Sequence, residues 1–179
     1  SLSISGSSST ATAIPKNGSR KPQKLETLPT GGVQFAVSPN KRILISTEKN
    51  SDWLISYIIS PDGSLKYGQQ FYWLHNTDNH NHTPYGNMQF DTDGNLYVAT
   101  PIGVQVCDHN GRVRAILPVP GRGVDFIAFS GNRLYAVSKG KIYVRTMKST
   151  GYDSWNESIA TISQPSAFTL TYLNSSESL

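Results

Sequence analysis

The sequence predicts an all-β fold in which short antiparallel strands are joined by tight hairpins. Helical periodicity is almost absent, and runs rich in β-branched and aromatic residues recur, separated by turn signals. The runs include RILIST, DWLISYIIS, NLYVAT, GVQVCD, RLYAVS and KIYVRT. The turn signals are Asn17-Gly18, Asp62-Gly63, Asp93-Gly94, Asn110-Gly111 and Gly131-Asn132. An Asn-Gly or Asp-Gly pair between apolar runs favours a hairpin because both central turn residues take positive φ.

The hairpins form a repeating unit. The segment GNMQFDTDGNLYVAT from Gly86 matches VQFAVSPNKRILIST from Val33, an alignment that pairs Ile43 with Leu96. It also matches DFIAFSGNRLYAVS from Asp125, which has one residue fewer in its turn. A second hairpin follows each copy, so each full unit has four short strands. Units of four strands that recur about every 40 to 50 residues are typical of β-propeller blades.

The length of 179 residues limits the chain to about four blades in a single domain over residues 1–179. Residues 33–74, 87–118 and 125–162 are predicted to form three full blades, and residues 1–28 the trailing strands of another. Residues 166–173, SAFTLTYL, are a further strand that could close a ring by pairing with the N-terminal strands. The domain is therefore either a small closed ring or part of a larger propeller.

The composition excludes several classes of partner. The formal net charge of +4 comes from scattered side chains, so no nucleic-acid partner is expected. No run approaches 18 apolar residues, and the first residues lack the charged and apolar regions of a secretory signal, so we expect a soluble chain with no membrane partner. The single cysteine, Cys107, excludes internal disulfides and is expected to be a buried, inert thiol.

The segment LHNTDNHNHTPYG places four candidate metal ligands within eight residues: His75, Asp78, His80 and His82. Imidazoles two residues apart on an extended strand point the same way and could share a metal ion. The alternative that we favour is a polar surface connection between two blades.

Four segments resemble the gluconolactonase / senescence marker protein / luciferin-regenerating enzyme family: PTGG…SPN, SPDGSLKYGQQFYWL, FDTDGNLYVATPIGVQVCDHNGRVRAILPVPG and FIAFSGNRLYAVSKGKIYVR. The resemblance extends from Pro29 to Met147. It implies a six-bladed propeller of which this chain is the C-terminal half. It also implies hydrolysis of lactones or related esters, with one divalent cation, often calcium, at the mouth of the central channel.

The resemblance places two family metal ligands inside this chain, and neither is kept. The asparagine of the family's P-N-G motif corresponds to Thr30, or to Val33 if the alignment is anchored on the following Ser-Pro. The aspartate of its D-G-M motif, which also acts in catalysis, corresponds to Gly86. Two weak candidates remain. Asn87 would reach the channel if its strand slipped by one residue, and Asp125 opens the third repeat where Gly86 opens the second. One carboxylate and one amide are too few for tight calcium binding.

Three hypotheses about function follow. The first is a gluconolactonase-like domain whose inherited metal and catalytic positions are lost and which serves as a binding or assembly module. The second is a metal-dependent hydrolase of sugar lactones or related esters, completed by a missing half-propeller or by self-association. The third is a propeller that binds a small sugar-derived ligand without chemistry. Large aromatic side chains could stack on sugars but are expected to pack between blades instead: Trp53, Trp73 and Trp155.

Overall fold

The computed structural model describes residues 2–4, 10–13, 23–27, 34–77 and 85–153, and it describes side chains from residue 34 onward. The predicted all-β fold is confirmed, because these residues form strands and turns and no helix. The described residues contain fourteen strands: β1 (Leu2–Ile4), β2 (Thr10–Ala13), β3 (Gln23–Thr27), β4 (Phe35–Val37), β5 (Ile43–Thr47), β6 (Trp53–Ile59), β7 (Leu65–Trp73), β8 (Met88–Phe90), β9 (Leu96–Thr100), β10 (Gly103–Cys107), β11 (Val113–Leu117), β12 (Phe126–Ser130), β13 (Arg133–Ser138) and β14 (Lys141–Thr146).

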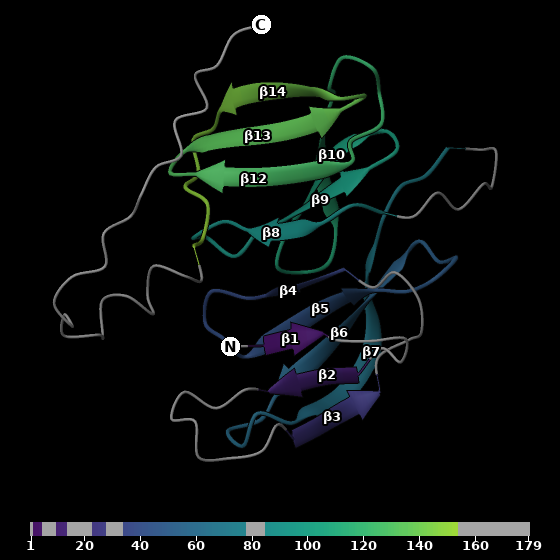
Figure 1. The fold of residues 1–179 in the computed structure, drawn as a ribbon, viewed down its shortest axis with the longest axis vertical. Coiled ribbons are helices and arrows are strands. Elements are labelled where there is room, and N and C mark those ends of the chain that lie inside the picture. Colours follow the sequence, from purple (N-terminus) through teal and green to yellow (C-terminus); the bar gives the residue numbers. More distant parts are fainter. Residues whose placement is uncertain (1, 5–9, 14–22, 28–33, 78–84, 154–179) are drawn as a thin grey trace, which may run out of the picture.

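The strands form four antiparallel sheets, in each of which neighbours in sequence are neighbours in space. The sheets are β1–β3, β4–β7, β8–β11 and β12–β14. Figure 1 shows them following one another in a row, with the β1–β3 and β12–β14 sheets at opposite ends. The first strands of successive sheets, β4, β8 and β12, contact one another, as the innermost strands of propeller blades do. The predicted closing strand, residues 166–173, lies outside the described residues.

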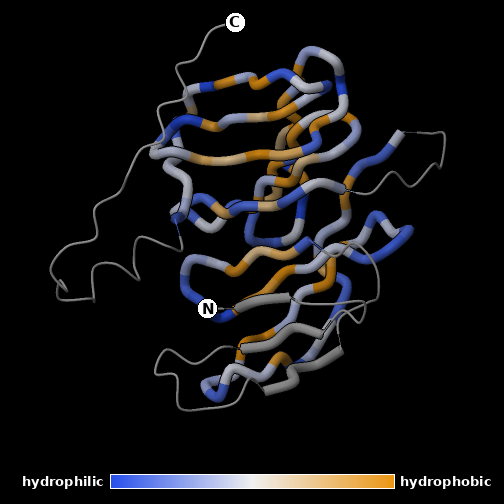
Figure 2. Tube along the Cα trace, viewed as in Figure 1, coloured by the Kyte–Doolittle hydropathy of each residue, from blue (hydrophilic) through white to orange (hydrophobic). Residues whose placement is uncertain are grey.

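Apolar side chains fill the spaces between successive sheets. One cluster lies between the β4–β7 and β8–β11 sheets and includes Ile45, Leu54 and Met88. A second lies between the β8–β11 and β12–β14 sheets and includes Val104 and Ile127. Figure 2 shows hydrophobic residues along the strands and hydrophilic residues at the turns that join them. Each sheet thus buries a face against its neighbour, which is how a stack of blades obtains a core.

The β4–β7 sheet also buries its other face. Leu44, Ile55, Tyr57 and Leu65 form a third cluster there, on the side where β3 contacts β7. Each face of the β4–β7 and β8–β11 sheets therefore contributes to a buried cluster, although several large side chains of β5–β7 remain partly exposed.

The outer face of the β12–β14 sheet is different, because it has no sheet against it among the described residues. The strand register places Phe126, Val137 and Ile142 side by side on this face, with Val144 beyond them. Phe126 is 50% exposed, Ile142 71% and Val144 61%. Among the described residues, this outer face of β12–β14 thus lacks the buried apolar cluster that the other faces of the middle sheets have.

Glycines at three predicted hairpin turns take positive φ: Gly63, Gly94 and Gly111, at 85°, 85° and 79°. The expectation that both central residues would do so is wrong, because the Asp or Asn before each glycine does not take positive φ. Lys41, at φ 59°, lies in the turn between β4 and β5, which is one residue longer than the turn between β8 and β9. The sequence alignment of Ile43 with Leu96 is therefore wrong by one residue. Leu44 is fully buried as Leu96 is, whereas Ile43 is 37% exposed.

The described residues contain no helix long and apolar enough to cross a lipid bilayer.

Candidate functional site

The residues that the sequence analysis assigned to the channel lie where the innermost strands begin. Gly86 and Asn87 immediately precede β8, and Asp125 immediately precedes β12. The Gly86 amide donates to the Ala99 carbonyl at 2.9 Å, and the Asp125 amide donates to the Val137 carbonyl at 2.8 Å. The two backbones meet at this end of the stack, because a Cβ on Gly86 would lie against the Asp125 carbonyl oxygen. The structure therefore places Gly86 and Asp125 at the starts of successive innermost strands and brings their backbones into contact.

The side chain of Asn87 links two sheets. Its Nδ2 donates to the Ile127 carbonyl at 2.8 Å, and its Oδ1 accepts from the Ile127 amide at 2.7 Å. Two residues further along β8, Gln89 Oε1 accepts from the Phe129 amide at 2.8 Å. Both polar ends of the Asn87 amide thus satisfy the backbone edge of β12, which would otherwise have unpaired groups. Asn87 therefore links the β8–β11 and β12–β14 sheets. Its amide is satisfied in the observed strand register, without the one-residue shift that would bring it to the channel.

The described residues do not fit the cation that the family resemblance implies. The Asn87 amide oxygen is engaged with Ile127. Gly86 has no space for a side chain, because a Cβ would lie 2.8 Å from Ala99 Cβ and closer still to the Asp125 carbonyl oxygen. Asp125 is exposed, and no group of three His, Cys, Asp or Glu residues that could hold a metal occurs in the described part of the chain. Thr30 and Val33 lie outside the described residues.

Of the histidine cluster, the structure describes only His75; Asp78, His80 and His82 lie outside the described residues. The His75 amide donates to Gln105 Oε1 at 2.8 Å, and Gln105 Nε2 donates to the His75 carbonyl at 2.7 Å. Gln105 is fully buried and also donates to Thr100 Oγ1 at 3.2 Å. A buried glutamine therefore fixes the start of the histidine segment to the next sheet.

Sequence reasoning missed the role of Gln105. The available signal was a glutamine in the middle of the apolar strand GVQVC, where a polar side chain must find partners when it is buried.

The single cysteine is buried as expected. Cys107 is free and fully buried. Burial, followed by the nearby charge of Asp108, raises the pKa of the Cys107 thiol to about 12. A thiol that stays protonated in this way is a poor nucleophile and a poor metal ligand.

The tryptophans are more exposed than expected for side chains packed between blades. Trp53 is 37% exposed and Trp73 54%, and they lie opposite each other on β6 and β7. Their ring centroids are 6.3 Å apart, and the centroid of the His75 ring lies 5.7 Å from that of Trp73. Trp155 lies outside the described residues.

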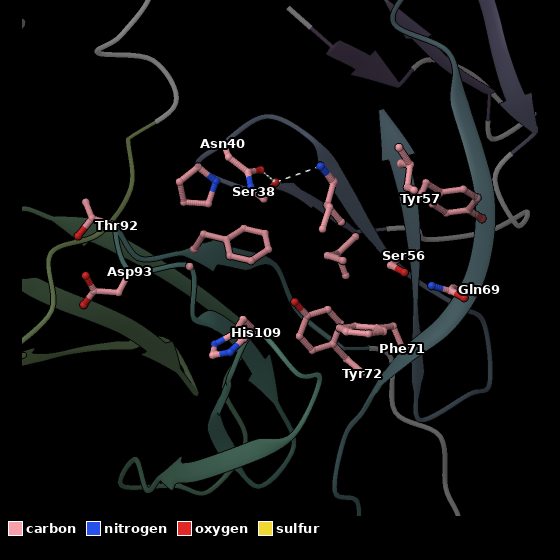
Figure 3. Close-up of a pocket in the computed structure, with 16 residues that line it drawn as sticks. Ser38, Asn40, Ser56, Tyr57, Gln69, Phe71, Tyr72, Thr92, Asp93 and His109 are labelled. Atoms are coloured by element: carbon pink, nitrogen blue, oxygen red, sulfur yellow. Dashed lines mark hydrogen bonds between the residues drawn. The ribbon is translucent and has the colours of Figure 1, made fainter. Parts of the chain in front are cut away.

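A cavity of about 440 Å³ opens between the β4–β7 and β8–β11 sheets, at the opposite end of β8 from Asn87. We call it the inter-sheet crevice (Figure 3). Its lining residues come from both sheets: Ser38, Pro39, Asn40, Ile43, Ile45, Ser56, Tyr57, Ile58, Gln69, Phe71, Tyr72, Phe90, Thr92, Asp93, Gly94 and His109. No motif predicted this crevice, because its walls come from strands and turns that are distant in sequence.

The polar groups around the crevice differ in how well they are satisfied. Ser38 Oγ donates to Asn40 Oδ1 at 2.8 Å and accepts from the Ile43 amide at 3.1 Å, so this turn satisfies itself. Tyr72 is only 4% exposed, and its hydroxyl bonds to no described residue. Figure 3 shows the hydroxyl oxygen of Tyr72 pointing away from β7 into the space between the sheets. Burial, with smaller electrostatic contributions from Cys107 and Asp108, raises the pKa of Tyr72 to about 12, so it is a neutral phenol at physiological pH.

Three solved structures share this arrangement of sheets. A gluconolactonase from Xanthomonas campestris superposes with a TM-score of 0.61 at 19% identity, over 81% of this chain and 45% of that one. A luciferin-regenerating enzyme superposes with a TM-score of 0.63 at 15% identity, over 83% of this chain and 55% of that one. The calcium-binding protein regucalcin from Agrobacterium tumefaciens strain C58 superposes with a TM-score of 0.62 at 16% identity, over 79% of this chain and 52% of that one. This chain has the fold of the gluconolactonase-like β-propellers.

The likeness confirms the fold that the sequence resemblance predicted. No protein-family model and no curated protein sequence matches this chain. The chain spans about half the length of the gluconolactonase-like structures that it matches. The described sheets therefore correspond to part of a propeller, and the end sheets of the row occupy positions that have further neighbours in a closed ring.

Proposed function

We propose that this gluconolactonase-like chain is an assembly module that self-associates through the outer face of β12–β14, and that it does not hydrolyse lactones by itself. The observation that most strongly supports the loss of hydrolysis is the pairing of Asn87 with the Ile127 backbone. Both amide atoms are in hydrogen bonds of 2.7–2.8 Å, and the neighbouring Gly86 has no room for a ligand side chain. A cation at this end of the stack would have too few oxygen ligands within reach.

The assembly role rests on the exposed outer face of β12–β14. Phe126, Ile142 and Val144 are at least half exposed on one face, whereas each face of the two preceding sheets contributes to a buried apolar cluster. Burying one such side chain is worth about 1.5–3 kcal/mol, so a sheet packed on this face would contribute substantially to stability. Two copies of this chain together have about the length of one gluconolactonase-like propeller, so we take a second copy as the partner.

Light scattering tests the assembly. We expect the 179-residue chain to have the mass of two copies at about 100 µM. Ile142→Lys should give single copies, because a lysine ammonium opposes burial of this face. Ile116→Lys, at a 39%-exposed isoleucine on β11, is the matched control and should remain dimeric. A mass of one copy for the unmodified chain would contradict self-association and would favour a separate half-propeller as the partner.

Calorimetric titration with calcium, zinc and manganese tests the loss of the cation site. We expect no submicromolar binding to the assembled chain and negligible hydrolysis of a sugar lactone. Submicromolar binding that Asp125→Ala abolishes and Asp93→Ala leaves intact would instead support the alternative function, a metal-dependent lactone hydrolase completed by association. Binding abolished by His80→Ala or His82→Ala would identify the histidine segment as a separate site.

A further inference from the structure

The inter-sheet crevice combines a sizeable cavity, exposed apolar side chains and a tyrosine hydroxyl without a described partner. Its volume of about 440 Å³ lies within the range of small-molecule sites, about 300–1,000 Å³. Ile43, Ile58 and Phe71 line it and are 37%, 50% and 36% exposed, so three large apolar side chains face water at one place. Phe90 and Ile45 also line it and belong to the buried cluster between the sheets.

The Tyr72 hydroxyl gives the crevice a specific polar feature. A buried polar group without a hydrogen bond is costly, and most such groups in folded proteins have a partner. The Tyr72 hydroxyl bonds to no described residue, and it is not among the fully enclosed unpaired atoms, of which Ser46 Oγ is the one found in the described residues. It is therefore reachable from the crevice, and a molecule in the crevice would be its partner.

The walls indicate the shape and charge of that molecule. Phe71, Tyr72 and Phe90 supply aromatic surfaces, and aromatic side chains favour flat ring partners in stacked or edge-on contact. The Asp93 carboxylate at the edge of the crevice disfavours an anion. A neutral phenol donates a hydrogen bond to an oxygen acceptor.

We propose that the inter-sheet crevice binds a small neutral molecule of one or two rings that places an oxygen acceptor on the Tyr72 hydroxyl. This site is separate from the start of the innermost strands, since Asn87 precedes β8 while Phe90, Thr92 and Asp93 lie at its end and beyond. It is also separate from the outer face of β12–β14, so it does not depend on the proposed assembly.

Acetophenone and ethylbenzene are suitable probes, because they differ in one carbonyl oxygen. Each is titrated into the 179-residue chain, and binding is followed by the NMR shifts of the Thr92, Asp93 and Gly94 amides, which line the crevice. We expect acetophenone to bind and Tyr72→Phe to weaken it about fivefold, the value of one net hydrogen bond. Ethylbenzene should change less than twofold in Tyr72→Phe.

Two further variants make the test decisive. Tyr143→Phe removes a phenol oxygen from a second cavity, of about 350 Å³, between the β8–β11 and β12–β14 sheets, and should leave both affinities unchanged. Ile58→Trp, at a half-exposed position, should fill part of the crevice and abolish both without unfolding the chain. Failure of acetophenone to shift the three amides, or an equal affinity in Tyr72→Phe, would overturn the proposal.

Discussion

The polar side chains at the two ends of strand β8 differ in whether the protein itself satisfies their hydrogen bonds. At its start, the amide of Asn87 is fully used in hydrogen bonds to the Ile127 backbone, and Gly86 leaves no space for anything else. Beyond its end, the inter-sheet crevice leaves the Tyr72 hydroxyl buried without a described partner. The start of β8, where the family resemblance predicts the functional site, is thus filled by the chain's own contacts, and we call it the closed end. The other end, at the inter-sheet crevice, has space for a ligand although no motif predicted a site there, and we call it the open end.

This contrast shows that a binding site depends on which polar groups are left available as well as on which residue types are present. A side chain committed to a neighbouring strand contributes to stability, because its removal leaves buried backbone groups unpaired. A polar group left unpaired beside a cavity contributes little to stability and is free to bind a ligand. Mutations at the two ends should therefore differ in their effect on the free energy of unfolding.

The largest effect is expected for Asn87→Ala. It removes two hydrogen bonds and leaves the amide and carbonyl of the fully buried Ile127 without partners, so we expect a loss of about 2–4 kcal/mol. Urea denaturation followed by tryptophan fluorescence measures it. Asn110→Ala, at an exposed turn position, is the matched control and should change stability by less than about 0.5 kcal/mol. Equal effects of the two variants would show that Asn87 is not a tie between sheets.

The second prediction concerns Tyr72, at the crevice end of β8, and the dependence of the free energy of unfolding on pH. Because the pKa of Tyr72 is about 12 in the folded chain and about 10 in an unfolded one, the folded state keeps the phenol proton where the unfolded state loses it. The stability from this proton is complete below pH 10 and is lost as the pH rises from 10 to about 12, at about 1.4 kcal/mol per pH unit.

Urea denaturation of the wild-type chain and of Tyr72→Phe at pH 9, 10 and 11 measures this loss. Other buried groups, such as Cys107 and Tyr85, also have raised pKa values, and both chains retain them. Only the difference between the two chains therefore reports on Tyr72. Parallel pH dependences would contradict a buried phenol at the crevice.

Much of the fold could be predicted from sequence, because hairpins are encoded locally. Asp62-Gly63, Asp93-Gly94 and Asn110-Gly111 each lie in a turn between paired strands as expected, although only the glycine of each pair takes positive φ. The repeat alignment was less reliable, since the extra residue in the turn near Lys41 moves the buried position from Ile43 to Leu44. A one-residue change in turn length reverses which face of a strand a side chain occupies, and sequence spacing alone does not reveal it.

The candidate sites were harder to predict, because their properties arise between sheets. That Asn87 pairs with Ile127 depends on the distance between β8 and β12, which are separated by the rest of a sheet in sequence. The crevice likewise joins the turns after β4 and β8 with side chains of β7. The family motif and the repeat alignment placed Gly86 and Asp125 at equivalent strand starts, but only the contacts show that the two meet and that this place is filled.

The third prediction tests the closed end by adding atoms to it. Gly86→Ala places a Cβ against the Asp125 carbonyl oxygen and Ala99 Cβ, so we expect a loss of about 1–3 kcal/mol from overpacking. Gly123→Ala is the matched control, because its Cβ would meet nothing closer than the Pro101 carbonyl oxygen at 3.7 Å. Gly86→Asp should destabilise the chain similarly and confer no calcium affinity. A stable Gly86→Asp variant that binds calcium would contradict the conclusion that the start of β8 has no space for a metal-binding side chain.

The smallest effect is expected for Tyr72→Phe at pH 7. The variant keeps the ring in the buried cluster and removes only a hydroxyl that bonds to no described residue, so the free energy of unfolding should change by less than about 0.5 kcal/mol. Tyr85→Phe is the matched comparison, because the Tyr85 hydroxyl donates to Asp52 Oδ1 at 2.6 Å and its loss should cost about 1.5–3 kcal/mol. Urea denaturation of both variants at pH 7 separates the two cases. A loss of stability in Tyr72→Phe as large as that in Tyr85→Phe would mean that the Tyr72 hydroxyl has a hydrogen-bond partner within the folded chain. The polar groups at both ends of β8 would then be satisfied by the protein, and the contrast between the two ends would be lost.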